Sequence, residues 1–205
     1  MAEPQKIILT IVDISGYTHF IKTHRASRVH AEEIIFDLLE AVIDRAEYPL
    51  TLNKLEGDAL LLYAYLIPGE ETAAARDVMR QIKQFFETFH TGKDELIQER
   101  AYCSCNACQR VGDLRLKAFL HRGEAFFRQI RHFDELAGED VILIHRLLKN
   151  TIPAAEYIAV TPPFTALLGD YLSGIPAEIH REHYNDFGPV ELKILLINSP
   201  KKEQV

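Results

Sequence analysis

The feature that most constrains the fold is a gap of three residues, Glu56-Gly57-Asp58, between β-rich segments at residues 50–55 and 59–66. A connection this short can only close a tight hairpin, so the two segments are expected to be antiparallel neighbours. An earlier β-rich segment at residues 6–14 ends in a glycine-containing turn. These three segments define the first part of a predicted sheet.

Apolar residues at helical spacing predict helices between these strands. In chain order we expect a strand at residues 6–14, a helix at 29–46, the hairpin at 50–66, a helix at 71–90, a second hairpin at 114–130 that turns at Arg122-Gly123, a helix at 139–149, and strands at 157–160 and 190–197. This order predicts an α+β protein with a ferredoxin-like βαββαβ sandwich, in which helices cover one face of a mostly antiparallel sheet.

The bulk properties narrow the class of protein. The chain has 205 residues, which fits one domain with a single core, so we expect one domain over residues 1–205. The net charge of −7 argues against a nucleic-acid partner, because proteins that bind the phosphate backbone are usually basic. The apolar run at residues 7–12 is too short to span a membrane, and no signal-peptide cleavage site follows it. We therefore expect a cytoplasmic protein without a membrane partner.

Two aspartates stand at turns that the predicted sheet brings together. Asp13 ends the first strand, and Asp58 lies at the tip of the first hairpin. Because that strand lies beside the hairpin in a ferredoxin-like sheet, both carboxylates could reach one pair of metal ions. Mg²⁺ prefers such hard oxygen ligands, and two ions can activate a hydroxyl and neutralise a leaving pyrophosphate. The alternative is that each aspartate is an ordinary turn residue.

A candidate phosphate-binding turn follows Asp13. Gly16 permits close approach of a ligand to the backbone, and the start of a helix favours anions. The backbone N–H groups of residues 15–18 could therefore hold a triphosphate.

Four segments resemble, in the same order, the motifs of class III adenylate and guanylate cyclases. The run Ile11-Val12-Asp13-Ile14-Ser15-Gly16-Tyr17-Thr18 is similar to their Asp-Ile-x-Gly-Phe-Thr motif, with Tyr17 in place of phenylalanine. The segment at 53–59 resembles their Lys-x-x-Gly-Asp hairpin, the segment at 116–124 their His-x-Gly-Glu strand, and the segment at 133–147 their Asp-x-x-Gly-x-x-Val-Asn-x-Ala-x-Arg-Leu run. The resemblance covers about residues 6–150, so residues 91–113 would be a cysteine-containing loop insertion and residues 151–205 a divergent C-terminal part.

The resemblance implies a nucleotidyl cyclase that converts a nucleoside triphosphate to a 3′,5′-cyclic nucleotide and pyrophosphate with two Mg²⁺ or Mn²⁺ ions. The implied metal ligands are Asp13, the carbonyl of Ile14 and Asp58; the implied phosphate contacts are Gly16, Tyr17 and Thr18; Lys54 and Asp134 would contact the base, and Arg146 would stabilise charge on the transferring phosphoryl group. In this family the metal ligands and the base and arginine residues come from opposite subunits. The resemblance therefore also implies a homodimer with two composite sites.

Two positions depart from the family pattern. Ile142 aligns with the family's asparagine and can donate no hydrogen bond, and the loss of one such donor typically costs about 100- to 1000-fold in rate. One extra residue lies between Asp134 and Gly138. Two alternatives to the enzyme therefore remain: a domain that binds nucleotide without turnover, and a structural dimerisation module.

Three cysteines, Cys103, Cys105 and Cys108, lie within six residues. Three thiolates at this spacing can surround one zinc ion, which takes four ligands in a structural site. We expect the fourth ligand to be His90, His121 or a cysteine from a partner chain, although His121 is more typical of a packing histidine. The alternative is a reduced thiol cluster without metal.

Overall fold

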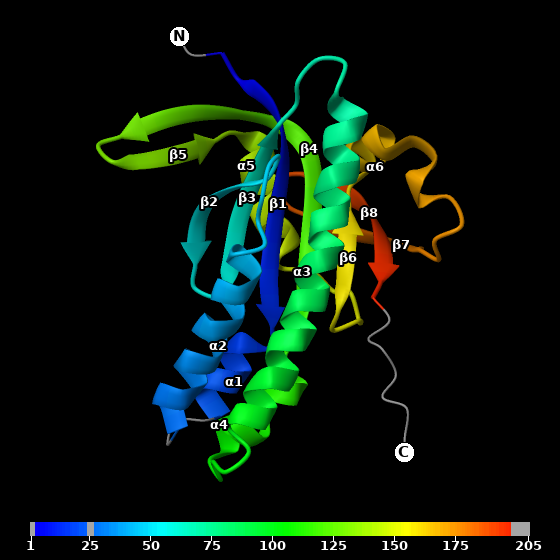
Figure 1. Cartoon of the computed structure of the whole chain (residues 1–205). Helices are drawn as coiled ribbons and strands as arrows, with labels where there is room; N and C mark the ends of the chain where they lie inside the picture. Colours follow the sequence, from blue (N-terminus) through cyan, green and yellow to red (C-terminus); the bar gives the residue numbers. More distant parts are fainter. Residues whose placement is uncertain (1–2, 24–26, 198–205) are drawn as a thin grey trace.

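The structure is a computed structural model that describes residues 3–23 and 27–197 (Figure 1). Within the described chain, the strands form one eight-stranded sheet in the order β2-β3-β1-β4-β6-β8-β7, and β5 pairs with β4 outside this path. The strands are β1 (Gln5–Ser15), β2 (Thr51–Glu56), β3 (Ala59–Tyr65), β4 (Arg115–Ile130), β5 (Phe133–Ala137), β6 (Tyr157–Val160), β7 (Glu178–Tyr184) and β8 (Gly188–Leu196). The helices are α1 (Tyr17–Thr23), α2 (Arg28–Ile43), α3 (Glu71–Glu99), α4 (Asn106–Gln109), α5 (Glu139–Leu147) and α6 (Pro162–Leu168), with 3₁₀ turns η2 (Val111–Asp113) and η3 (Gly169–Leu172).

The first half of the sheet has the ferredoxin-like order β2-β3-β1-β4, with β1 antiparallel to both of its neighbours. β6 is parallel to β4, and the remaining pairs are antiparallel. The predicted α+β class and mostly antiparallel sheet are thus confirmed.

Successive residues of β1 point to opposite faces and enter two cores, as strand geometry requires. Ile8 and Val12 lie in the larger core, under α2, α3 and α6. Ile7 and Leu9 lie in the smaller core, which α5 covers from the opposite face. The expectation that helices cover one face is therefore wrong for α5, because the apolar side of this short helix packs on β1 and β4 from behind.

The second hairpin lies further along the chain than expected. Residues 115–130 form one continuous strand, and the turn falls at Arg131 and His132, where Arg131 adopts φ = 59°. Gly123 is not a turn residue, because β1 pairs with the whole stretch from Arg115 to Ala125 and keeps it extended. In Figure 1 the β4–β5 hairpin projects beyond the body of the sheet.

The segment at 91–113 is mostly helical rather than a loop. α3 continues to Glu99 because Phe89, Lys93 and Leu96 keep one helix face buried past residue 90. The buried Lys93 donates to the carbonyl of Leu114 at 2.8 Å, which fastens the helix to the start of β4. α4 and η2 follow, so residues 100–105 are the part that connects helices.

The C-terminal part adds elements that the sequence did not reveal. β7 is a sheet-edge strand whose side chains are mostly exposed, so it lacks an alternating apolar pattern. The strand expected at 190–197 is β8, and the strand expected at 157–160 is β6. None of the helices in the described ranges is both long and apolar enough to cross a bilayer.

Candidate metal and nucleotide site

The two aspartates meet at one end of β1. Asp13 pairs across the sheet with Ala59, and the N–H of Ile14 donates to the carbonyl of Asp58 at 3.2 Å. Burial raises the pKa of Asp58 to about 6, and the negative charge of Asp13 and a side-chain hydrogen bond to it act in the same direction. The structure therefore places the two predicted metal-binding carboxylates in direct electrostatic contact.

Lys117 adds a positive charge to this pair, and the sequence reasoning did not assign it a role. It lies directly opposite Asp13 on β4, and its Nζ is 2.9 Å from Oδ2 of Asp13. The lysine lies within the cyclase-like segment at 116–124, but only the pairing of β1 with β4 brings it to the aspartates. Two carboxylates and one ammonium leave a surplus of negative charge that a divalent cation could neutralise.

The turn after Asp13 has the shape that the sequence suggested. Gly16 has φ = 87°, a conformation that favours glycine, and its carbonyl accepts from the N–H of Phe20 as α1 begins. Gly16 and Thr18 are exposed, whereas Tyr17 is half-buried against the larger core. A hollow of about 350 Å³ opens beside this turn, lined by Tyr17, Glu32, Ile35, Phe36, Leu55 and Gly57. Tyr17 of the candidate phosphate turn thus borders an open volume.

The predicted base-contacting residues lie on neighbouring elements, but their pairing differs from the expectation. Lys54 on β2 forms an ion pair with Glu135 on β5 at 2.7 Å, and Asn53 donates to the carbonyl of Asp134 at 2.9 Å. Glu135 stands three residues before Gly138, which is the spacing of the Asp-x-x-Gly motif. The sequence reasoning missed Glu135 because it aligned the motif on aspartate rather than on spacing.

α5 carries Arg146 and Ile142 on its exposed side. Arg146 is 3.3 Å from Asp186 in the connection between β7 and β8, and no ion pair joins it to Asp13 or Asp58 within the described chain. Ile142 is 53% exposed and lines a hollow of about 360 Å³ together with Arg146 and Lys149. The neighbouring His145 contacts Glu56 at 3.0 Å, so α5 is tied to the hairpin that holds Asp58.

His121 is a packing histidine, as its position suggested. Its ring bonds to Thr161 at 2.8 Å and to Asp140 at 2.9 Å, and the other oxygen of Asp140 accepts from the N–H of Glu124 at 2.7 Å. The hydrogen bond with His121 is the largest of the effects that lower the pKa of Asp140. This network fixes the start of α5 on β4.

The cysteine cluster does not use either histidine that we expected. His121 is engaged as described, and His90 pairs with Glu156 at 3.1 Å. Instead, His30 from α2 lies with Cys103, Cys105 and Cys108, and one ligand atom of each lies within 4.8 Å of every other. This group could hold a metal ion. The long separation in sequence left no spacing signal for His30.

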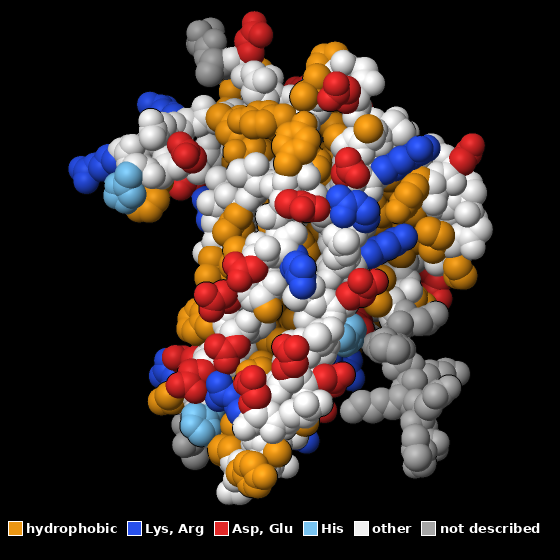
Figure 2. All heavy atoms as spheres, viewed as in Figure 1, with side chains coloured by type: hydrophobic (Ala, Val, Ile, Leu, Met, Phe, Trp, Pro, Cys, Tyr) orange, Lys and Arg blue, Asp and Glu red, His pale blue; other side chains and the backbone are white. Residues whose placement is uncertain are grey.

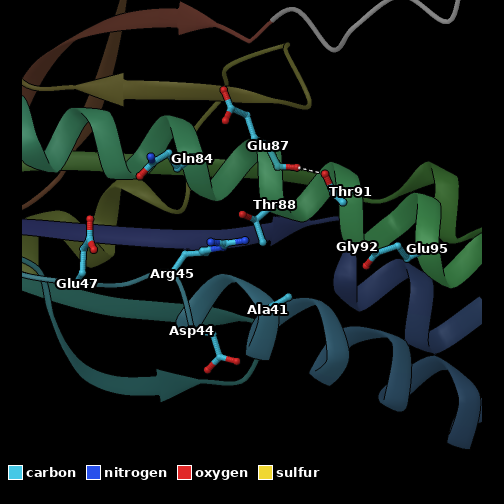
Figure 3. Close-up of a pocket in the computed structure, with 10 residues that line it drawn as sticks. All are labelled: Ala41, Asp44, Arg45, Glu47, Gln84, Glu87, Thr88, Thr91, Gly92 and Glu95. Carbon is cyan, nitrogen blue, oxygen red and sulfur yellow. Dashed lines mark hydrogen bonds between the residues drawn. The ribbon is translucent and has the colours of Figure 1, made fainter.

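A hollow of about 840 Å³ lies between α2 and α3, and none of the predicted site residues lines it. Figure 3 shows its walls, where Arg45, which follows the end of α2, extends toward Thr88 of α3. Acidic side chains also gather over these helices in Figure 2. A surface with this excess of carboxylates is unsuited to a triphosphate.

Comparison with known families decides the chain's membership. Residues 35–157 match the family described as "Protein of unknown function (DUF2652)". The chain belongs to the DUF2652 family. It is also 40% identical over 125 residues to the protein Rv2561/Rv2562 of Mycobacterium tuberculosis, a match that covers 60% of this chain. The match covers 55% of the length of that relative, so this DUF2652 chain spans about half of it.

Solved structures show what this DUF2652 chain is similar to in fold. The adenylyl cyclase CyaB from P. aeruginosa superposes with a TM-score of 0.71 at 14% identity, covering 98% of both chains. The guanylyl cyclase Cya2 gives a TM-score of 0.71 at 13% identity, covering 98% of this chain and 97% of that one. A class III adenylyl cyclase-like ATP-binding protein from Pseudomonas aeruginosa gives 0.64 at 12% identity, covering 81% and 35%. The chain therefore has the fold of class III nucleotide cyclase domains, as the motifs suggested.

The raised pKa of Asp58 predicts pH-dependent metal binding by this DUF2652 chain. A divalent ion needs the carboxylate, which is the dominant form only above about pH 6. The rise in melting temperature on adding Mn²⁺ should therefore be small at about pH 5 and complete by about pH 7.5. Thermal melts with and without Mn²⁺ at both pH values measure it.

In the metal-free protein, this carboxyl should instead make stability fall as the pH rises. Its pKa in the fold lies above the ordinary value of 3.8, so the stability that it contributes below that value is lost as the pH rises through about 6. The Asp58→Asn variant is the control: its melting temperature should not respond to Mn²⁺, and it should lack the part of the pH dependence that the Asp58 carboxyl contributes. An equal Mn²⁺ effect at both pH values in the unmodified protein would contradict the assignment.

Proposed function

We propose that the chain is a nucleotidyl cyclase that converts a nucleoside triphosphate to a 3′,5′-cyclic nucleotide and pyrophosphate. The observation that carries the proposal is the meeting of Asp13 and Asp58 beside the Gly16 turn, on the fold of class III cyclase domains. Fold similarity alone does not give function, so the argument depends on this site.

The donor set fits two divalent ions, Mg²⁺ or Mn²⁺. Asp13, Asp58 and the carbonyl of Ile14 offer hard oxygen atoms, and the charge of the carboxylates exceeds that of the Lys117 ammonium. When bound, such ions lower the pKa of the attacking ribose hydroxyl and neutralise charge on the phosphates. The chain's own part is to fix the ligands at the end of a buried strand.

The other predicted residues bind and orient the substrate. The backbone N–H groups of Gly16, Tyr17 and Thr18 hold phosphate oxygens at the open turn. Lys54 contacts the base together with Glu135, which lies at its side in the position expected for Asp134. Because Lys54 donates hydrogen bonds and the Glu135 carboxylate accepts them, this pair can bind both an acceptor and a donor on the edge of a base.

Arg146 acts on the site of a second copy of the chain in this proposal. Within one chain it pairs with Asp186 and not with the acid pair, Asp13 and Asp58. Its side chain is about half exposed. A two-fold homodimer would bring Arg146 of the partner subunit to the transferring phosphoryl group, where a preorganised cation stabilises the developing charge.

A direct assay tests the proposal. The full chain at high concentration is incubated with each of the four ribonucleoside triphosphates and Mn²⁺ or Mg²⁺, and cyclic nucleotide and pyrophosphate are separated and quantified. Formation of one cyclic product in step with pyrophosphate supports the enzyme. Absence of product with every triphosphate and both ions would refute it.

Ile142 favours a second candidate function, binding of a nucleoside triphosphate without turnover. An apolar side chain stands, exposed, where the family has an asparagine donor beside the arginine. One of the similar solved structures is described as a cyclase-like ATP-binding protein. Calorimetry that shows metal-dependent triphosphate binding in a protein without turnover would favour this candidate.

The Ile142→Asn variant separates the two candidates further. If only the transition-state donor is missing, the asparagine should raise turnover by about tenfold, a part of the 100- to 1000-fold that a fully preorganised donor supplies. Because Ile142 is exposed on α5, the change should leave the melting temperature nearly unaltered. The readout is initial rate at saturating triphosphate, with the exposed Val29→Asn variant as a control for surface polarity. An unchanged or lower rate would contradict this account of Ile142.

A further inference from the structure

Three sulfur atoms surround a single nitrogen atom at nearly equal distances. The Sγ atoms of Cys103, Cys105 and Cys108 lie 3.4, 3.4 and 3.5 Å from Nδ1 of His30. None of the three cysteines forms a disulfide. The four side chains come from two separate parts of the chain, α2 and the segment that follows α3.

Hydrogen bonding does not account for this arrangement. An imidazole nitrogen either donates one hydrogen or accepts along one lone pair, so it can satisfy one sulfur and not three. A tetrahedral zinc ion with Zn–S of about 2.3 Å and Zn–N of about 2.05 Å separates sulfur from nitrogen by about 3.6 Å. The observed distances therefore match the edges of a zinc coordination tetrahedron.

We propose that His30, Cys103, Cys105 and Cys108 form a closed Cys₃His site for one structural zinc ion. Thiolate and imidazole donors in tetrahedral arrangement are the ligands that zinc takes in structural sites. The N–H of Cys108 donates to Sγ of Cys105 at 3.4 Å, a contact that supports thiolate at this sulfur and orients it. With four protein ligands, the site leaves no open position for a substrate, which distinguishes it from a catalytic zinc.

The place of the site shows what the ion would do. His30 lies in the first turn of α2, whereas the cysteines lie in and just before α4, and Figure 1 shows α4 packed at the ends of α2 and α3. Cys108 is buried in the larger core, and Cys103 and Cys105 pack against it. The zinc ion would therefore fasten the start of α2 to the end of α3. α2 also carries Glu32 and Phe36, which line the hollow beside Tyr17.

Metal analysis of the unmodified full chain is the first test. Protein purified without chelator should contain about one zinc per chain, and its exchange for Co²⁺ should give the intense visible bands of tetrahedral cobalt with thiolate charge transfer in the near ultraviolet. Iron in place of zinc, or Co²⁺ spectra typical of six-coordinate oxygen ligands, would overturn the proposal. No Mg²⁺ or Mn²⁺ is added, so that the acid pair does not contribute.

Variants at His30 test the fourth ligand. His30→Ala should lower zinc affinity by at least about 100-fold, since even the loss of a residue that only supports a ligand costs 10- to 100-fold. His30→Cys completes a Cys₄ site and should retain affinity within about tenfold. The exposed His183→Ala is the matched control and should bind as the unmodified chain does. Unchanged zinc affinity in His30→Ala would overturn the role of His30.

Thermal stability tests the site in the unmodified chain, so this test does not require that every variant can be purified. EDTA should lower the melting temperature of the unmodified chain and of His183→Ala by roughly 10 °C, as expected when a ligand present at about 1000 times its dissociation constant is removed. His30→Cys should respond similarly. A melting temperature that EDTA leaves unchanged in the unmodified chain would show that no metal stabilises the fold, and would overturn the structural role.

Discussion

Replacing Asp58 by asparagine is expected to lower cyclic-nucleotide formation by at least about 1000-fold, because it removes a ligand and the charge that attracts the ions. Asparagine keeps the size of the side chain. The negative charge of the site falls, however, to the single carboxylate of Asp13, which Lys117 at 2.9 Å already neutralises. The variant should therefore also lose the rise in melting temperature that Mn²⁺ produces in the unmodified chain.

A second consequence separates a functional carboxylate from a structural one. The pKa of Asp58 is raised, so its ionised form is unfavourable in the metal-free fold, and Asp58→Asn should melt at a higher temperature than the unmodified chain at about pH 8. An aspartate that only stabilised its turn would give the opposite sign. Asp77→Asn, on the exposed surface of α3, is the control and should keep both activity and the Mn²⁺ response. Activity that survives in Asp58→Asn would refute the metal assignment.

Replacing Gly123 by alanine should have the largest effect on stability. A Cβ at this position would lie 2.3 Å from Cγ and 2.5 Å from Cβ of Asp140, so the whole aspartate side chain would have to move. Its carboxylate would lose the hydrogen bonds to His121 and to the N–H of Glu124, and His121 would be left buried without this partner. We expect a loss of about 3 kcal/mol or more in the free energy of unfolding, and a melting temperature lower by roughly 10 °C.

The control for this substitution is Gly112→Ala. The nearest side-chain atom to a Cβ at Gly112 is Cδ1 of Ile97 at 3.8 Å, an ordinary contact distance. Urea unfolding of both variants, followed by circular dichroism, gives the two free energies. A Gly123→Ala variant as stable as Gly112→Ala would mean that α5 is not anchored through Asp140.

The parts of the fold that sequence reasoning recovered depend on local pattern. The hairpin around Gly57 and the helix α2 follow from turn chemistry and helical spacing, which act over a few residues. Asp13 and Asp58 could be brought together because a ferredoxin-like order already places β1 beside that hairpin. For the acid pair, a local pattern and a single topology rule were enough.

The errors arose where a distant contact decides the local structure. Gly123 has the composition of a turn, but its role is to leave room for Asp140 on α5. The polar stretch after residue 90 remains helical because Lys93 is buried and bonded to Leu114. His30 joins cysteines that follow it by more than seventy residues, and no spacing rule reaches that far. Each of these contacts joins residues that are far apart in the sequence.

The unbroken β4 strand has a consequence for how this chain can change in length. Lys117 beside the acid pair, Gly123 under α5 and Arg128 opposite Glu135 all lie on it, and the first and last are about 36 Å apart along an extended strand. A single inserted residue between them would turn every later side chain to the other face of the sheet. A change of one residue in β4 between these positions would therefore separate Lys117 from Asp13 or Arg128 from Glu135.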